Sequence, residues 1–348
     1  MTTPKVIAVV PVYNGEPLVV IGAIKSLLLQ DYPCLRIVVV DDCSKEPLYS
    51  LLLKEFSDFH QLTVLRNERN AGFAQTLNRA LESVIDETFL LVLEQDCELL
   101  DTDYITKALK HFNCDYVGVV SGENLLPPDE NLSLVKRIFV NHLCENVHDS
   151  GVAEVGFSLL KADVFRIDVL KKVGGFESSA EWKLASEEHI ISCKIRSSGY
   201  KIIKDSNLQF RAYWGRQEKL WQNLGKEAIY GRGLGWALAR AQSDLKIGES
   251  EQLKSKRFSR MIQVQYVLLT VFSVFMFLYS PLLSLALLSL TTLVQFAYLI
   301  HRSFVFSRIK EKLLFVATGF MRSWIYVPNF FIGFLYGLIL RCKERVFE

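Results

Sequence analysis

Short apolar runs alternate with amphipathic stretches over about the first 120 residues of the chain. The apolar runs predict buried β-strands at 6–10, 35–40, 62–65 and 89–93. The amphipathic stretches repeat their apolar residues at helical spacing and predict helices at 16–30, 47–59 and 74–85. Apolar strands that alternate with helices are typical of a parallel sheet covered on both faces. The pattern therefore predicts an α/β domain, continued by an expected strand at 155–160 and an expected helix at 187–198.

The pattern changes near residue 260, where charged residues disappear from a long apolar stretch. Residues 262–300 contain no Asp, Glu, Lys or Arg, and Pro281 lies near their middle. A membrane-spanning helix needs about 20 apolar residues, so this stretch predicts a hairpin of two transmembrane helices. A third apolar stretch, 313–340, is interrupted by Arg322, and the sequence leaves its topology open.

These changes divide the chain into an expected α/β domain, 1–245, and an expected membrane-anchoring region, 246–348. Basic residues on both flanks of the hairpin favour cytoplasmic ends. The expected location is therefore the cell membrane, crossed several times, with the α/β domain in the cytoplasm. The run that follows the first five residues predicts a strand instead of a signal peptide.

Composition excludes several classes of protein. Lys and Arg number 40 against 38 Asp and Glu, so no basic field indicates a nucleic-acid partner. The seven cysteines form no CxxC pair and predict free thiols instead of a disulfide framework or a zinc site. The absence of GxGxxG after the first strand, and of GxxxxGK[ST] anywhere, disfavours a dinucleotide-dependent oxidoreductase or a P-loop NTPase.

Acidic residues gather where predicted strands end. Asp41 and Asp42 follow the second strand, and Glu94 and Asp96 follow the fourth. The carboxyl ends of parallel strands meet at one edge of a sheet, and ligands bind beyond that edge. Acids brought together there repel one another unless a cation compensates, and oxygen ligands suit Mg²⁺ or Mn²⁺ bound together with substrate phosphates. The nearby acids of residues 98–101 are expected to begin the next helix instead.

Six segments in order resemble the family 2 glycosyltransferases. They are VVPVYNG, VVVDDCSKE, NAGFAQTLNRAL, LVLEQDCEL, GFSLLKADVFRIDVLKKVGGFE and SEEHIISCKIRSSGYKI. The resemblance extends over about residues 5–240. It implies the GT-A fold, a Rossmann-like and mostly parallel sheet with helices on both faces, joined here to C-terminal transmembrane helices.

The resemblance implies that the first half of the domain binds a nucleoside diphosphate sugar. Pro11 and Tyr13 match the first nucleotide-contacting loop, and Asp41 matches the acid that binds the base or the ribose. Asp42 would support that loop. The residues that match the next sugar-nucleotide segment are Asn70, Gly72 and Asn78.

The resemblance also implies which residues carry the chemistry. Asp96 and Glu94 stand at the family's metal-binding DxD motif, with Mg²⁺ or Mn²⁺ as the expected cofactor and Asp96 as the main ligand. Glu188, with Glu187 beside it, stands where the family has the general base of its ED pair. Arg232 is a further candidate, either near the departing diphosphate or on a basic interfacial helix.

Three features depart from the family pattern. The DxD motif is ExD, and the ED pair is Glu-Glu, whose second acid keeps its carboxylate one methylene further from the backbone than Asp would. The His that the family often places near Tyr213 or Trp214 as a metal ligand is absent. The stretch Gln217-x-x-Leu220-Trp221 also lacks the Arg of the QxxRW motif of processive relatives, which argues against a polymerase.

The sequence therefore predicts an inverting, hexosyltransferase-like enzyme of polysaccharide biosynthesis at the cytoplasmic membrane face. Its expected partners are a nucleoside diphosphate sugar, membrane lipid, and an acceptor hydroxyl on a saccharide, on a lipid-linked saccharide or on a polyprenyl carrier. Two alternatives stay open. One is a metal-dependent nucleotidyl or phosphoryl transferase, which would need no base at Glu188, and the other is a non-catalytic membrane protein that binds a nucleotide sugar.

Overall fold

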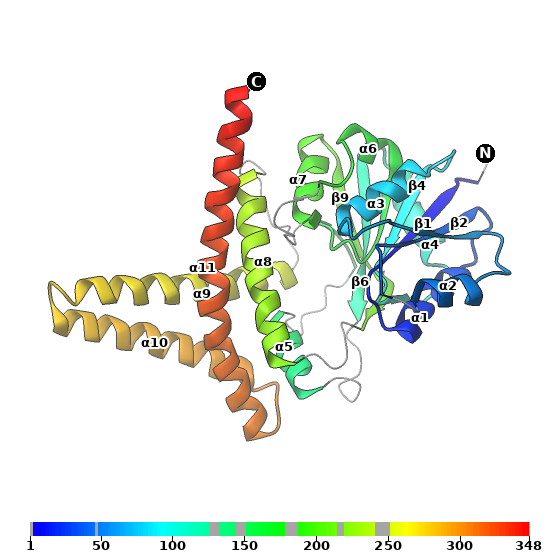
Figure 1. Ribbon diagram of the computed structural model, residues 1–348. Helices are drawn as coiled ribbons and strands as arrows, with labels where there is room; N and C mark the ends of the chain where they lie inside the picture. Colours follow the sequence, from blue (N-terminus) through cyan, green and yellow to red (C-terminus); the bar gives the residue numbers. More distant parts are fainter. Residues whose placement is uncertain are drawn as a thin grey trace. The chain divides into compact units, whose positions relative to one another are not determined.

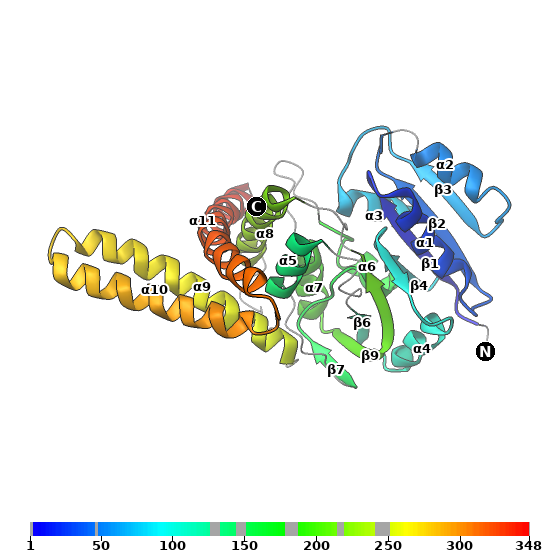
Figure 2. The same ribbon diagram turned by 90° about the horizontal axis from the view of Figure 1, so that it is seen from below.

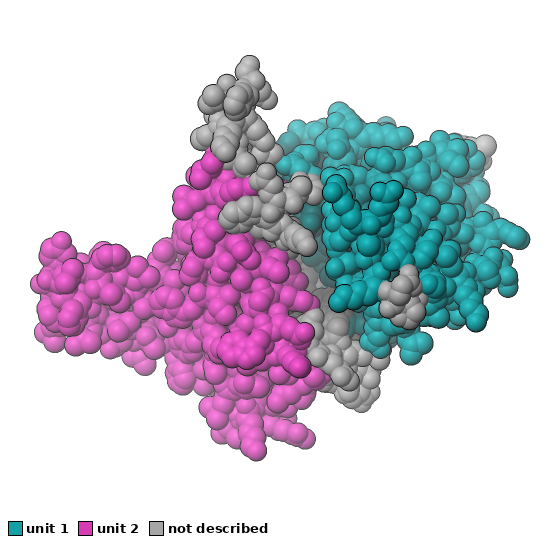
Figure 3. Space-filling model, viewed as in Figure 1, with its two compact units in different colours: residues 1–128, 148–215, 243–250 teal, residues 129–147, 216–242, 251–348 magenta. Residues whose placement is uncertain are grey.

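A computed structural model of the chain describes residues 3–45, 48–125, 133–143, 151–177, 187–213, 219–240 and 251–347. The chain divides into two compact units, which Figure 3 shows in different colours. The first unit contains 1–128, 148–215 and 243–250, and the second contains 129–147, 216–242 and 251–348. This division differs from the expected boundary at 245, because the second unit already includes two segments that precede it.

The first unit is built on one mixed sheet (Figures 1 and 2). Its strands are β1 (Val6–Val12), β2 (Leu35–Asp41), β3 (Leu62–Arg66), β4 (Phe89–Leu93), β5 (Cys97–Leu99), β6 (Val117–Leu125), β7 (Val152–Val155), β8 (Ala162–Arg166) and β9 (Lys201–Ala212). They follow the order β3-β2-β1-β4-β8-β6-β9-β5, and β7 pairs with β9. The pairs β3–β2, β2–β1 and β1–β4 are parallel, whereas β8 is antiparallel to both β4 and β6. The expected parallel sheet therefore describes the N-terminal half of the unit, and the C-terminal half corrects it to a mixed sheet.

Helices cover both faces of this sheet because its strands are apolar on both faces. In β1, alternate residues such as Ala8 and Val10 belong to a core shared with α1 (Pro17–Leu28), α2 (Leu48–Glu55) and α4 (Tyr104–Leu109). The intervening Ile7 and Val9 are also fully buried and point to the opposite face. The helices α3 (Phe73–Glu82), α6 (Ile167–Lys172) and α7 (Glu187–Ser197) lie on that opposite face in Figure 1. The α/β architecture with helices on both faces is thus confirmed.

Two local predictions were wrong. The strand expected at 155–160 is replaced by β7, which ends at Val155, and by β8, which begins at Ala162. Glu98 does not begin a helix, because it lies in β5 opposite Arg211 of β9. The next helix, α4, begins only at Tyr104, so Asp101 also precedes it.

The second unit is helical in the residues that the structure describes. Its helices are α5 (Leu134–Leu143), α8 (Leu220–Arg240), α9 (Glu251–Met276), α10 (Pro281–Ser303) and α11 (Ile309–Phe347). The predicted turn at Ser280 and Pro281 is present, and it joins α9 and α10 into a hairpin. The Ser280 hydroxyl accepts a hydrogen bond from the backbone N–H of Leu283, and Pro281 occupies the first helical position. Both features are favoured starts for a helix.

Helices α8 and α11 approach each other through glycines. A methyl group added at Gly235 would lie 1.9 Å from the Phe330 carbonyl oxygen, and one at Gly333 would lie 1.9 Å from the Arg232 carbonyl oxygen. Such close backbone contact is possible only with glycine at both positions. Nearby, the guanidinium of Arg322 pairs with Glu227 of α8 at 2.8 Å, so the charge that interrupts the third apolar stretch is neutralised inside the unit.

Among the described residues, α10 alone combines the length and the apolar composition that a membrane span requires. Its 23 residues would extend about 35 Å, which exceeds the roughly 30 Å of a bilayer core. The apolar part of α9, Met261–Met276, is shorter than a span. The expectation of two or more spans therefore stays a prediction.

Candidate functional site

Hydrogen bonds connect the loops that follow β1, β2 and β4 at the carboxyl edge of the parallel strands. The backbone N–H of Tyr13 donates to the Gln95 side chain at 2.9 Å, and the Gln95 amide donates back to the Tyr13 carbonyl at 3.2 Å. The backbone N–H of Asn14 donates to the Ser44 hydroxyl at 2.8 Å. The first loop is therefore held between the other two, and Gln95 holds it although the sequence motifs gave Gln95 no role.

Asp42 holds the loop that precedes α3. Its buried carboxylate accepts hydrogen bonds from the Asn67 amide at 2.7 Å and from the backbone N–H groups of Ala71 and Gly72 at 2.7 and 2.8 Å. Gly72 has a φ of +90°, which glycine adopts without strain, and it caps the N-terminus of α3. Asp42 thus fixes the loop before α3, and the support that the motif implied for the nucleotide loop of Asp41 stays a prediction.

The other donor-side candidates differ in exposure. Asp41 is fully buried at the end of β2, where it accepts from the Ser44 backbone N–H and lies 3.5 Å from the Arg66 guanidinium. Pro11 is buried within β1. Tyr13 is 46% exposed and Asn70 is exposed, so these two side chains face solvent.

Asn78 binds the backbone of its own domain. Its amide donates to the Phe176 carbonyl at 2.7 Å and accepts from the Phe176 N–H at 2.9 Å. Both ends of the amide are thus used to connect α3 to the Gly174-Gly175-Phe176 turn. These bonds give Asn78 a part in the fold, and the nucleotide contact that the motif implied stays a prediction.

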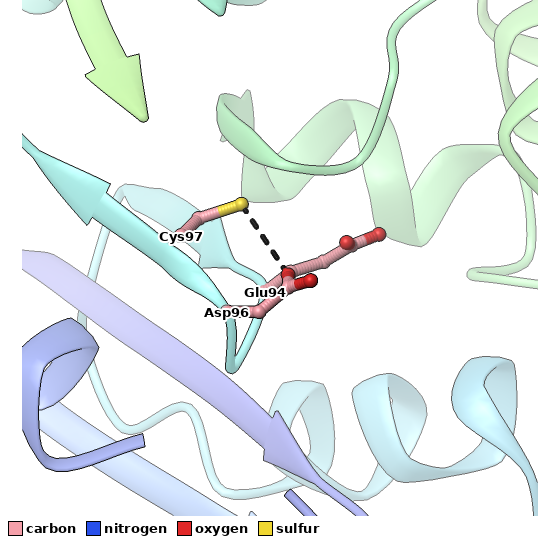
Figure 4. A group of neighbouring side chains, drawn as sticks. All are labelled: Glu94, Asp96 and Cys97. Carbon is pink, nitrogen blue, oxygen red and sulfur yellow. Dashed lines mark hydrogen bonds between the residues drawn. The ribbon is translucent and has the colours of Figure 1, made fainter. Parts of the chain in front are cut away.

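Glu94 and Asp96 come together after β4, with Cys97 beside them (Figure 4). One potential ligand atom from each of the three side chains lies within 4.8 Å of the other two. The Cys97 thiol donates to Asp96 at 3.7 Å, and its burial raises its pKa well above the ordinary value. A protonated thiol is a poor metal ligand. The two carboxylates therefore fit a hard divalent cation better than the thiol does.

Lys161 places an ammonium group against these acids, and the sequence motifs did not identify it. Its Nζ contacts the Glu94 carboxylate, and the Glu94 backbone N–H donates to the Lys161 carbonyl at 2.9 Å. Burial, together with the charges of Asp96 and Glu188, raises the pKa of Glu94 to about 7, although Lys161 opposes this shift. Burial works against the charge of Lys161, but Glu94 and Asp96 raise its pKa well above the ordinary value. Lys161 is therefore a cation fixed among carboxylates.

Glu188 lies in the first turn of α7, directly after Glu187. Its carboxylate is 3.2 Å from Nδ1 of His189, whose ring stacks on Phe157. Burial would raise the pKa of Glu188, but the adjacent His189 outweighs this effect and lowers the pKa below its ordinary value. Glu188 is thus held as a carboxylate near the Glu94 and Lys161 charges.

Several candidates lie elsewhere or beyond the described residues. The Tyr213 hydroxyl donates to Glu98 at 2.7 Å. Trp214 and Gln217 lie outside the described residues. Arg232 is carried by α8 in the second unit, and its role near a diphosphate stays a prediction.

Comparisons with known proteins agree with the motifs. The family model described as Glycosyl transferase family 2 matches residues 7–161, a range that ends before Glu187 and Glu188. The O-antigen chain rhamnosyltransferase RfbN of Salmonella typhimurium is 25% identical over 208 residues, which cover 57% of this chain and 63% of the relative. The uncharacterized protein y4gI of Sinorhizobium fredii is 31% identical over 169 residues, which cover 44% of this chain and 18% of the relative. This chain therefore spans less than two thirds of the length of either relative.

Solved structures share the fold at low sequence identity. The mannosyltransferase PcManGT from Pyrobaculum calidifontis, in complex with GDP-Man and Mn²⁺, matches 97% of this chain and 88% of its own, with a TM-score of 0.58 and 17% identity. GalNAc-T7, with UDP, GalNAc and Mn²⁺, matches 74% of this chain and 54% of its own, with a TM-score of 0.50 and 13% identity. The first unit has the GT-A fold that the motifs implied.

Proposed function

We propose that this protein is an inverting glycosyltransferase that uses a nucleoside diphosphate sugar, because residues 7–161 match the Glycosyl transferase family 2 model. One observation carries the proposal. Glu188 is far from Glu94 and Asp96 in the sequence, yet it lies close enough to them in the first unit for its charge, like that of Asp96, to raise the pKa of Glu94. A site that must hold a diphosphate and deprotonate an alcohol needs such a combination of groups.

Glu188 is the proposed general base. His189 keeps it ionised, so it accepts the proton of the acceptor hydroxyl as that oxygen attacks the anomeric carbon. Attack from the face opposite the leaving diphosphate breaks the sugar–phosphate bond and inverts the anomeric centre. The exposed Tyr13 and Asn70 belong to the loops proposed to contact the nucleotide. Gln95 and Asp42 fix the conformations of these loops before the donor binds.

A divalent cation fits the acidic end of β4, where Asp96 would hold it and Glu94 lies alongside. Bound there, Mg²⁺ or Mn²⁺ supplies positive charge for the diphosphate. The Mn²⁺ in the complexes of the two structural neighbours supports this assignment. Burial raises the pKa of the neighbouring Cys97 thiol, which stays protonated and leaves the two carboxylates as the ligands.

The proposed acceptor is a lipid-linked saccharide or a polyprenyl carrier at the cytoplasmic face of a membrane. Support comes from α10, whose residues Leu282, Leu285 and Leu293 are 82%, 54% and 63% exposed. Apolar surface of this kind on a long helix suits contact with lipid. The O-antigen chain rhamnosyltransferase among the relatives supports a role in polysaccharide biosynthesis.

The test is a donor screen on the full chain in detergent, followed by a transfer assay. Thermal unfolding is measured with UDP- and GDP-sugars, each with and without Mn²⁺, because a ligand that binds the folded state raises the melting temperature. We expect one nucleotide to give a Mn²⁺-dependent rise, and its sugar to be transferred with inversion to a lipid acceptor extracted from membranes. Transfer of a phosphoryl or nucleotidyl group, or tight nucleotide binding without any turnover, would contradict the proposal.

A further inference from the structure

Lys161 reaches Glu94 through the pairing of two strands that are distant in sequence. Strand β8 runs antiparallel to β4, with Leu93 opposite Ala162, so Lys161 and Glu94 are the next residues of the two strands. Their side chains form an ion pair in which Lys161 is 18% and Glu94 is 26% exposed. An ion pair of an exposed lysine usually contributes little to the stability of a protein. Here the partial burial and the backbone hydrogen bond between the same two residues hold the pair in place.

The segment before Lys161 is built to hold this position. Leu160 has a φ of +57°, a left-handed conformation that costs a non-glycine residue free energy. Its backbone N–H donates to the buried carboxylate of Asp163 at 2.6 Å, and that carboxylate also accepts from the Ser158 hydroxyl. These bonds stabilise the unusual backbone, which delivers the Lys161 ammonium to Glu94. The lysine is therefore a positioned group and not a mobile surface chain.

We propose that Lys161 is a built-in counter-cation that occupies Glu94, so that Glu94 does not coordinate a divalent ion in the donor-free protein. This inference rests on the proposed function and deepens it. Hard divalent ions are commonly held by one or two carboxylates together with substrate phosphates. With Glu94 occupied, the protein binds Mn²⁺ weakly through Asp96 until a nucleoside diphosphate supplies the missing oxygen ligands. The metal ion therefore binds tightly only together with the donor, and not before it.

The test measures Mn²⁺ binding without nucleotide, by the electron paramagnetic resonance signal of free Mn²⁺ titrated with the full chain in detergent. Lys161→Met releases Glu94, and we expect Mn²⁺ affinity to rise on the order of 10-fold or more, the size of effect produced by changing partners of metal ligands. Glu94→Gln in the wild-type background is expected to leave Mn²⁺ affinity within twofold. The double variant Lys161→Met with Glu94→Gln is expected to return to the wild-type value.

Matched controls separate this effect from general changes. Lys161→Arg keeps the cation and should retain the wild-type affinity. Lys25→Met breaks another Lys–Glu pair, at 2.7 Å from Glu55 on the surface, and should change nothing. Thermal unfolding of each variant checks folding. The proposal is overturned if Lys161→Met leaves Mn²⁺ affinity unchanged, or if Glu94→Gln weakens it as much as Asp96→Asn does.

Binding of GDP and UDP, measured by calorimetry on the same samples, tests the proposed function separately. If neither nucleotide binds but Lys161→Met still raises Mn²⁺ affinity, the counter-cation role of Lys161 is supported and the proposed glycosyltransferase function is contradicted. If the protein binds and uses a donor but Lys161→Met leaves Mn²⁺ affinity unchanged, the glycosyltransferase function is supported and the counter-cation role of Lys161 is contradicted.

Discussion

Asp42 after β2 and Glu94 after β4 follow similar buried strands of the same parallel block, yet the protein neutralises these two acids differently. Around Asp42 the partners are backbone N–H groups and one amide, all of them uncharged. Around Glu94 the partner is the Lys161 ammonium, with other carboxylates close by. Backbone donors hold a loop in one conformation, whereas charged side chains can exchange partners when a ligand arrives. We infer from this difference that Asp42 serves mainly the fold, whereas the pair after β4 is suited to chemistry.

The largest expected effect concerns the acid proposed to act on the substrate. Glu188→Gln removes the base while keeping the shape of the side chain, and we expect kcat to fall about 10²- to 10⁴-fold with donor binding retained. The measurement is steady-state transfer together with nucleotide calorimetry. Glu55→Gln, in a surface ion pair, is the matched control. A Glu188→Gln enzyme within tenfold of wild type would remove Glu188 from the mechanism.

Asp42→Ala tests the structural role of the acid after β2. It leaves three donors without their charged acceptor in a buried position. We expect a loss of roughly 3 kcal/mol or more in the free energy of unfolding, because hydrogen bonds to charged groups contribute about 1.5–3 kcal/mol each and do not add fully. Denaturant unfolding of the full chain measures it, and Asp42→Asn should recover part of the loss. An Asp42→Ala protein of unchanged stability that fails to bind donor would assign Asp42 to the ligand instead.

Asn78→Ala should have a smaller effect of the same kind. The change removes two hydrogen bonds to the Phe176 backbone, and we expect a destabilisation of about 1–2 kcal/mol. The KM for the donor should stay within twofold at temperatures where the variant is folded. A large rise in KM without loss of stability would restore the nucleotide contact that the motif implied.

The smallest expected effect is on stability and concerns Asp205, an acid away from the carboxyl edge of the parallel strands. Burial would raise the pKa of Asp205, but hydrogen bonds from the Asn207 backbone and from His111 lower it below the ordinary value of 3.8. A lowered pKa in the folded state stabilises the protein above the unfolded pKa, and this contribution is lost as pH falls through the folded pKa. Asp205→Asn should therefore lower the free energy of unfolding near pH 7, and progressively less below pH 4. Thermal unfolding across this pH range checks the trend, and a pH-independent cost would refute it.

Much of the N-terminal half was predictable because its strands are continuous apolar runs. Strands β1, β2, β3 and β4 were placed within one or two residues of their observed ends. The C-terminal half was harder, since β9 reads KIIKDSNLQFRA, in which polar and apolar residues alternate regularly only over 207–212. Its pairing with β5, β6 and β7 depends on contacts that no local pattern records.

The residues of the candidate site were likewise predictable only in part. The acids after β2 and β4 were identifiable because each follows a strand directly. Lys161 was not, because it meets Glu94 across 67 positions through an antiparallel register. Asn78 was assigned to the nucleotide because it matches a family segment, and its contact with the Phe176 backbone, 98 positions away, leaves no local signal. Motifs locate groups along the chain, whereas the partner that decides each group's role is supplied by the fold.

The glycine contacts between α8 and α11 have a mechanical consequence. With carbonyl oxygens of Phe330 and Arg232 where methyl groups would otherwise stand, neither helix can slide past the other or rotate without a steric clash. The buried Arg322–Glu227 pair fastens the same two helices at another level. The two helices are therefore expected to move as one unit, so that a displacement of α11 at this contact carries α8 with it.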